Sequence, residues 1–234
     1  MLPKLNDTPL FTMKVPSSGM EVKYRPYLVK EEKVLLMAFE SGDNKQALSA
    51  VADTILSCVD GDLDKSKLTP FDVEYMFTQI RGKSVGEVAK VAINCTECDE
   101  KNEVEIDLEK VYVDRPEVEK NVKLTDRYII ELRHPTYMDM VKSVPTTEDM
   151  SAMFDMLMTC MYSVHDLEEE TQALFSDESK EDINVFVESL SPSVLNKIKE
   201  FMEGTPKTKY HMEFKCTGCG HETKTELEGM QNFL

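Results

Sequence analysis

The sequence predicts an α+β protein made of two similar halves, residues 1–117 and 118–234. Three observations lead to this fold class. Short stretches of alternating apolar and polar residues indicate β-strands, and longer stretches with apolar residues three or four positions apart indicate helices between them. Near its end, each half carries a C-x2-C motif flanked by β-prone residues, at residues 95–98 and 216–219. We call these motifs the first and the second knuckle.

The first half begins with two alternating stretches around a turn at residues 16–19, which predicts a β-hairpin. The segment KEEKVLLMAFESGD predicts a helix that ends near Gly42, and NKQALSAVADTILSCV predicts a second helix. After an acidic turn, Thr69 as N-cap and Pro70 at the first helical position open a third helix. The half then runs as strand, first knuckle and strand.

The second half begins with a predicted strand pair that turns at residues 126–127, followed by a helix from near Thr136. The segment TEDMSAMFDMLMTCMYSV predicts a helix capped by Thr147 that continues to Val164. Apolar side chains at helical spacing predict a buried stripe on this helix, made of Met153, Met156, Leu157, Cys160 and Met161.

An acidic stretch, residues 166–182, follows this helix and is expected to be a solvated loop or a short helix. Leu174 and Phe175 lie inside it and are a candidate docking element. Ser191 as N-cap and Pro192 at the first helical position then open the last helix, and Gly204 stops it. The chain closes as strand, second knuckle and strand.

The two halves present their elements in the same order, and the last helix of each opens with a hydroxyl residue followed by proline. Thr96 also aligns with Thr217 without a gap. We therefore predict an internal duplication, with halves near residues 8–112 and 118–234. Chance similarity is the alternative, because strand–helix–strand orders recur widely.

Four of the six cysteines form the two knuckles: Cys95, Cys98, Cys216 and Cys219. A structural zinc ion takes four tetrahedral ligands, so each knuckle supplies half of a site. We predict that the two halves hold one structural Zn²⁺ between them, with no coordination position open to a substrate. Cys58 and Cys160 lie in helical patterns and are predicted to be core residues.

Three alternatives to the shared zinc site remain open. A redox C-x2-C pair precedes a helix, whereas strands follow both knuckles here. Separate sites would need histidines, and His211 and His221 are poorly spaced for this. The third alternative is no metal at all. Glycines at 218 and 220 favour a tight turn in the second knuckle, while Glu97, Asp99 and Glu100 weaken the signal in the first.

The net charge of −17, from 44 acidic and 27 basic residues, would repel nucleic acid. No apolar run reaches about 18 residues, so we expect no membrane span. The beginning of the chain lacks the layout of a secretory signal, and we expect a reducing cytoplasm, in which cysteines bind metal more often than they form disulfides.

Motifs that mark enzymes are missing from the sequence. It has no G-x-x-x-x-G-K-[ST] loop, no G-x-G-x-x-G after a strand, no G-x-S-x-G elbow and no H-E-x-x-H pair. We predict no enzymatic activity, no catalytic residue and no small-molecule substrate. The 15 methionines suit adaptable contact surfaces as well as a core, so protein–protein contacts are the expected mode of action.

Two segments carry a resemblance to a known family: KVPSSGMEVKYRPYLVKEEKVLLMA near the start, with R-P-Y-L-V-K-E-E at residues 25–32, and FKCTGCGHETKTELEGMQNFL at the end. The chain resembles the baseplate hub family of T-even-like contractile-tailed bacteriophages over most of its length. That family includes a hub subunit and a related hub-assembly factor.

The resemblance implies a structural or chaperone-like assembly role in the tail baseplate. The implied partners are other baseplate hub proteins, and the implied location is the host cytoplasm during assembly or the virion baseplate. The resemblance supplies no catalytic residue, and the oligomeric state stays open. The alternative function is a zinc-ribbon regulator that binds nucleic acid. It would need a basic face, but the lysines around the second knuckle alternate with Glu213, Glu222 and Glu226.

Overall fold

The computed structural model describes residues 8–142 and 150–229. The chain forms two compact units, the first from Met1–Asp114 with Lys207–Leu234 and the second from Arg115–Pro206. The predicted halves, 1–117 and 118–234, refer to a repeat in the sequence, and their limits differ from those of the units. The last hairpin, which ends the second half of the sequence, belongs to the first unit.

The first unit starts with an antiparallel sheet in the order β1-β2-β3. Its strands are β1 (Phe11–Lys14), β2 (Glu21–Tyr24) and β3 (Val59–Asp60). Gly19 adopts a φ of 70° in the turn between β1 and β2, a conformation that glycine takes without steric cost. The predicted hairpin is therefore present, and a third strand from beyond the helices joins it.

Three helices complete this part of the first unit: α1 (Val29–Glu40), α2 (Asn44–Cys58) and α3 (Pro70–Ser84). A 3-10 turn, η1 (Lys65–Lys67), precedes α3. Thr69 caps α3 as predicted, and Asp72, whose role was not predicted from the sequence, completes a reciprocal capping box. Asp72 also accepts a hydrogen bond from the backbone N–H of Ser17 at 2.7 Å, which fixes the β1–β2 turn against α3. The helices α2 and α3 supply fully buried core side chains: Val51, Ile55, Val73, Met76 and Ile80.

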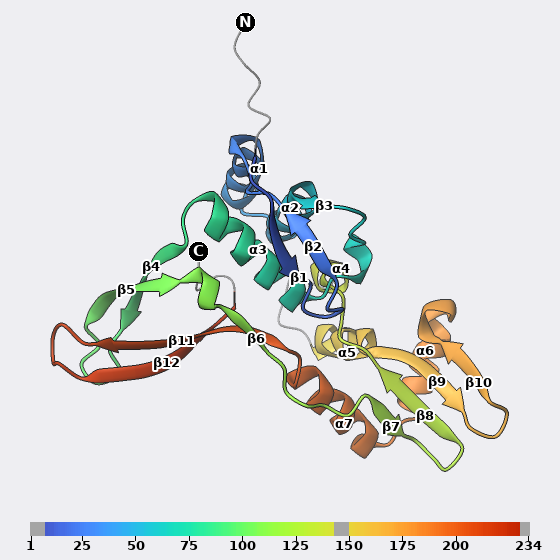
Figure 1. Ribbon diagram of the computed structural model, residues 1–234. Coiled ribbons are helices and arrows are strands. Elements are labelled where there is room, and N and C mark those ends of the chain that lie inside the picture. The colour runs from blue at the N-terminus through green and yellow to red at the C-terminus, as the bar shows by residue number, and fades with distance from the viewer. Residues whose placement is uncertain (1–7, 143–149, 230–234) are drawn as a thin grey trace, which may run out of the picture. The chain divides into compact units, whose positions relative to one another are not determined.

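Two hairpins project from the first unit and run side by side in Figure 1. One is β4 (Val88–Asn94) with β5 (Lys101–Asp107). The other is β11 (Lys207–Lys215) with β12 (Glu222–Glu228), and β6 (Tyr112–Asp114) pairs with the free edge of β11. A small core at the base of the hairpins, near the 3-10 turn η2 (Leu108–Lys110), consists of Ala89, Ile106, Leu108 and Val111.

The second unit is built on an antiparallel sheet in the order β10-β9-β8-β7. Its strands are β7 (Asn121–Lys123), β8 (Tyr128–Leu132), β9 (Met161–Asp166) and β10 (Thr171–Leu174). Its helices are α4 (Tyr137–Lys142), α5 (Met150–Thr159), α6 (Lys180–Glu188) and α7 (Pro192–Glu203), with the 3-10 turn η3 (Phe175–Asp177). Leu157 of α5, Ile198 and Phe201 of α7, and Ile130 and Leu132 of β8 share one core.

The helix predicted to continue to Val164 is shorter than expected. Helix α5 ends at Thr159, and Met161 begins β9. The N–H of Cys160 closes the last turn on Leu157 at 3.1 Å, after which the chain pairs with β8. Leu157, Cys160 and Met161 are buried as predicted, although Met161 is buried from a strand, and Met156 is only half-buried. Thr147 and the side chain of Met153 lie outside the described residues.

The acidic stretch 166–182 is not a loop for most of its length. It contains the β9–β10 turn, strand β10, η3 and the start of α6. Arg127 bonds both Asp166 and Glu169 across the sheet, which neutralises part of the acidic charge and favours the hairpin. Leu174 and Phe175 are half-buried, and the ring of Phe175 packs edge-on against Phe186, 5.5 Å between centroids.

Each unit contains the same local arrangement where the second strand of its first hairpin leads into a helix. The N–H of Arg25 bonds the carbonyl of Cys58 at 2.9 Å, and that of Arg133 bonds the carbonyl of Cys160 at 2.8 Å. Both arginines also form an ion pair six residues on, Arg25 with Glu31 and Arg133 with Asp139. The duplication itself stays a prediction.

No helix among the described residues combines the length and the apolar character needed to cross a membrane.

Candidate metal centre

The two knuckles bring four sulfur atoms together, and all four lie within 4.8 Å of one another. The Sγ atoms of Cys95 and Cys219 are 3.7 Å apart, and those of Cys98 and Cys216 are 3.6 Å apart. A tetrahedral zinc ion with bonds of about 2.3 Å separates its sulfur ligands by about 3.8 Å. The spacing therefore fits a single ion held by both knuckles.

The two knuckles have the same backbone geometry. The N–H of Cys95 bonds the carbonyl of Glu100 at 2.9 Å, and that of Cys216 bonds the carbonyl of His221 at 2.8 Å. The strand registers also match at a constant offset: Asn94 pairs with Lys101 and, 121 residues later, Lys215 pairs with Glu222. Two similar hairpins thus present their cysteines in equivalent positions.

A residue with positive φ closes each knuckle. Gly220 has a φ of 75°, and Asp99 occupies the equivalent position in the first knuckle with a φ of 59°. Aspartate is one of the few side chains that tolerate this conformation, and the amide of Asn94 donates to its carboxylate at 3.1 Å. The weaker sequence signal of the first knuckle therefore does not prevent the same turn.

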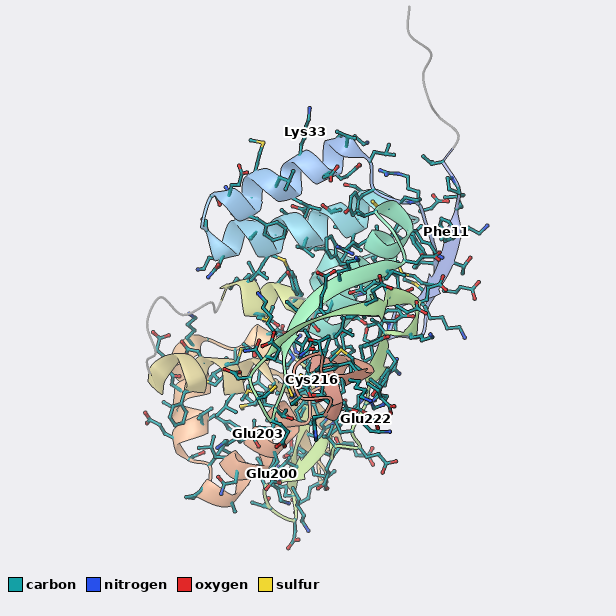
Figure 2. The ribbon with its side chains drawn as sticks, turned by 90° about the vertical axis from the view of Figure 1, so that its left-hand side faces the viewer. Phe11, Lys33, Glu200, Glu203, Cys216 and Glu222 are labelled. Atoms are coloured by element: carbon teal, nitrogen blue, oxygen red, sulfur yellow. The ribbon has the colours of Figure 1, made fainter. Side chains whose placement is uncertain are left out.

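The second knuckle contacts the first closely at Gly218. A β-carbon there would lie 3.1 Å from Cγ and 3.2 Å from Cβ of Glu100. The N–H of Gly218 also donates to Sγ of Cys216 at 3.3 Å, and the N–H of Glu97 donates to Sγ of Cys95 at 3.5 Å. Figure 2 labels Cys216 and Glu222, which bound this knuckle.

The cluster favours a thiolate at Cys216. The backbone N–H of Cys219 contributes most to this effect and, against the opposing effect of burial, lowers the pKa of Cys216 to about 6. At Cys98 the backbone N–H of Glu100 also lowers the pKa, but contacts with the other thiols outweigh it and raise the pKa to about 12. A site of this kind releases protons when it takes up a metal cation.

Asn102, on β5, is part of the site and was not indicated by the sequence. Its side chain is 3% exposed, and its Nδ2 atom donates to the carbonyl of Glu100 at 2.8 Å and to Sγ of Cys216 at 3.6 Å. Its Oδ1 atom accepts from the N–H and the hydroxyl of Thr217 at 2.8 and 3.0 Å. A buried polar residue at an inward position of a strand is the only signal that could have found it.

The histidines have other contacts. His211 bonds Tyr112 through Nε2 at 2.8 Å and Glu226 through Nδ1 at 2.9 Å. The ring of His134 stacks on Phe201, 4.7 Å between centroids. Among the residues that the structure describes, the candidate metal ligands are the four cysteines of the knuckles. The two knuckles therefore converge on a common point, as the shared-site prediction requires.

Cys58 and Cys160 are buried, at 2% and 0% exposure, in the first and second unit respectively. Burial raises the pKa of each thiol to about 11, so both are uncharged at neutral pH. This environment fits the core role that the sequence predicts.

Ser163, His165 and Glu131 form a cluster whose composition resembles a hydrolase triad. However, a single ring nitrogen, Nε2 of His165, lies 3.1 Å from both the serine hydroxyl and the glutamate carboxylate. A relay needs the hydroxyl and the carboxylate on opposite ring nitrogens. This geometry therefore makes a local hydrogen-bond network and not a relay.

Three of the four lysines on the β11–β12 hairpin, all except Lys215, are engaged by carboxylates among the described residues. Lys224 pairs with Glu213 at 2.8 Å, and Lys207 pairs with Glu228 at 2.9 Å. Lys209 contacts Asp114 at 2.8 Å as well as Glu226 and Glu228. The positive charge on this hairpin is thus largely balanced, which does not favour a surface for a phosphate backbone.

Comparisons with known proteins give one match. The family described as T4 bacteriophage base plate protein matches residues 8–234, nearly the whole chain. No curated protein and no solved structure matches the chain. The resemblance carried by residues 25–32 and by the second knuckle is therefore confirmed at the level of the family. The chain belongs to the T4 bacteriophage base plate protein family.

Proposed function

We propose that this chain is a structural or chaperone-like assembly protein of the baseplate hub, that it acts through contacts with other hub proteins, and that it holds one structural Zn²⁺. Membership of the family, over nearly the whole chain, is the observation that carries the baseplate role. The protein would work in the host cytoplasm during assembly and would have no enzymatic activity.

An exposed apolar surface on α1 supports a role in protein contacts. Leu35 and Ala38 face the core of the first unit, while Val29, Leu36 and Met37 are 64%, 54% and 72% exposed. Lys33, labelled in Figure 2, projects outward from the same helix. Adjacent apolar side chains that remain exposed commonly mark a surface that binds another protein.

Substitution at this surface tests the contact role. The chain is co-expressed with the hub proteins of its phage, and complexes are separated by size-exclusion chromatography. Met37→Lys should remove the chain from the hub complex with little effect on its own stability, because Met37 is exposed. Val185→Lys is the matched control, since Val185 is 68% exposed on α6. If the unmodified chain co-elutes with no hub protein, the hub assignment is wrong.

Zinc is proposed on the geometry of the four sulfurs, which suits a tetrahedral ion with no open position. Four thiolates favour zinc over the oxygen-preferring cations. The role is structural: the ion would join a hairpin from the middle of the sequence to a hairpin from its end.

Metal analysis of the purified chain tests this proposal. We expect one zinc per chain, and cobalt substitution should give the absorption spectrum of a tetrahedral tetrathiolate site. Cys219→Ser should lower the zinc content severalfold, whereas Cys160→Ala, a change in the other unit, should leave it at one. A metal-free wild-type chain that does not take up zinc would contradict the proposal.

The repeated arrangement gives the shared site a simple origin. We propose that the chain arose by internal duplication, so that each copy contributes one knuckle. The constant offset between the two strand registers and the equivalent Arg25 and Arg133 contacts support this. The structure of a related protein that contains only one copy would test this proposal. We expect such a protein to carry one knuckle with two cysteines.

A further inference from the structure

Asn102 and Thr223 occupy equivalent positions in the two hairpins, but only Asn102 forms side-chain hydrogen bonds to the knuckles. Asn102 pairs with Ile93 across β4–β5, and Thr223 pairs with Phe214 across β11–β12. Both side chains are buried, at 3% and 4% exposure. Among the described residues, the hydroxyl of Thr223 has no hydrogen-bond partner, whereas the amide of Asn102 makes four contacts.

The four contacts of Asn102 connect the two knuckles. One amide proton goes to the carbonyl of Glu100 on its own hairpin, and the other goes to Sγ of Cys216 on the partner hairpin. Its carbonyl oxygen accepts both the N–H and the hydroxyl of Thr217. Asparagine is suited to this position because a single short side chain carries two donors and an acceptor.

These contacts have two physical effects on the site. The bonds to Thr217 fix the second knuckle at one position relative to β5, which sets the distance between the two pairs of sulfurs. The bond to Sγ of Cys216 places a donor beside a sulfur that carries negative charge when a metal is bound, and this spreads the charge of a tetrathiolate site. A leucine of similar size would provide neither effect.

We propose that Asn102 is the positioning residue of the four-cysteine site, which docks the second knuckle on the first and donates a hydrogen bond to one metal-binding sulfur. The inference rests on the zinc site proposed above. It also assigns an asymmetry to the centre: the first hairpin orients the second, and the equivalent Thr223 takes no part.

Three variants of the full chain test the role: Asn102→Leu removes all four contacts, Asn102→Asp keeps the acceptor for Thr217 but loses both donors, and Thr223→Val is the matched control. Zinc affinity is measured by competition with a chromophoric chelator. Loss of such an outer contact costs about 10-fold to 100-fold in metal affinity. We expect this loss for both Asn102 variants and none for Thr223→Val.

Cobalt spectra give a readout that a purely structural role would not move. A sulfur that loses a hydrogen bond donates electrons more readily, so its charge-transfer band should shift to lower energy in both Asn102 variants. The band of Thr223→Val should stay at the wild-type energy. Circular dichroism shows whether each variant folds, and if Asn102→Leu does not fold, Asn102→Asp decides the question.

Two results for the variants would overturn the inference while leaving the zinc site in place. One is an equal loss of affinity in Thr223→Val and Asn102→Leu, which would mean that any change in this buried layer disturbs the site. The other is wild-type affinity and band energy in Asn102→Asp. A wild-type chain that binds neither zinc nor cobalt would instead overturn the zinc proposal, and this inference with it.

Discussion

Single residues in the two knuckles reach the same backbone geometry by different chemical means. The second knuckle uses Gly218 and Gly220, and the first uses Glu97 and Asp99 at the equivalent positions. Asp99 accepts a positive φ and gains a hydrogen bond from Asn94. Gly218 has a different role: it allows close packing between the knuckles, because the side chain of Glu100 in the first knuckle lies next to the position that a β-carbon of residue 218 would take. The pair of knuckles is therefore less symmetric in side chains than in backbone.

Gly218→Ala tests this close approach. The added carbon would lie 3.1 and 3.2 Å from the side chain of Glu100, which is tighter than an ordinary contact, so the Glu100 side chain must shift or the two knuckles must separate slightly. We expect a loss of about 1 kcal/mol of stability and weaker zinc binding. Glu97→Ala, at the equivalent position of the first knuckle, is the control and should change neither. Unchanged zinc affinity in Gly218→Ala would mean that Glu100 can move aside freely.

At the scale of elements, the N-termini of α3 and α7 have similar sequences but differ in how many hydrogen bonds cap them. Both helices begin with proline after a hydroxyl residue. Thr69 and Asp72 form a buried capping box on α3, and Asp72 also holds Ser17. The hydroxyl of Ser191 makes no capping bond to α7 and meets the hydroxyl of Ser193 instead. The cap of α3 thus joins the hairpin to the helix, whereas that of α7 is local.

Removing the two hydroxyls should therefore have unequal effects. Thr69→Ala should cost about 1 to 2 kcal/mol, because it leaves a buried N–H and the Asp72 carboxylate with fewer partners. Ser191→Ala should cost less than about 0.5 kcal/mol, as for an exposed substitution. Chemical denaturation of both variants measures the difference. Equal losses would mean that the buried cap of α3 adds nothing to stability.

His134 gives the second unit a predicted dependence on pH. Burial, with a smaller contribution from Lys120, holds the pKa of His134 below its ordinary value of 6.5. Because the folded pKa lies below the unfolded one, the unfolded chain binds the proton more tightly. The stability contribution is complete above pH 6.5 and is lost as the pH falls from there through the folded value.

His134→Phe should remove this loss, since phenylalanine can stack on Phe201 without binding a proton. Hydrogen exchange of peptides from the second unit at pH 7.5 and pH 5.5 measures the effect after correction for the intrinsic exchange rate. His221→Gln, at an exposed position of the other unit, is the control and should leave the pH dependence of the second unit unchanged. A wild-type second unit with equal stability at both pH values would contradict the prediction.

At the scale of the whole molecule, the first unit is made from two distant parts of the chain, and the second unit is the segment inserted between them. Strand β6 pairs with β11, and the four sulfurs join β4–β5 to β11–β12. A metal at this site would close the first unit. The second unit has its own sheet and core, and no residue of the knuckles belongs to it.

Removal of the proposed zinc ion should therefore affect the two units unequally. A chelator should increase hydrogen exchange in the peptides of β4, β5, β11 and β12, because zinc ligation contributes about 10–16 kcal/mol to small peptides that depend on it. Peptides from β7 to α7 of the second unit serve as the internal control and should exchange as before. A uniform increase in both units, or no change in either, would contradict this expectation.

Much of the local structure was predictable from the sequence. The hairpins, the cap at Thr69, the start of α7 at Pro192 and the four cysteines all follow from short patterns, because turns and caps depend on neighbouring residues. At Ser191 only the position of the helix start is as predicted, since its hydroxyl makes no capping bond. The end of α5 was not predictable, because Met161 and the residues after it continue a helical pattern. Pairing with β8 makes this segment a strand. Contacts with a neighbouring strand therefore override the local preference of these residues for a helix.

By itself, the sequence determined which thiols are available as ligands, since two C-x2-C motifs supply four cysteines whose number and type suit one tetrahedral ion. Only the tertiary structure decided that the last hairpin belongs to the first unit, and that Asn102 links the knuckles. The reason is physical: ligand chemistry is a property of residue type, whereas the distance between two hairpins depends on packing between residues more than a hundred positions apart.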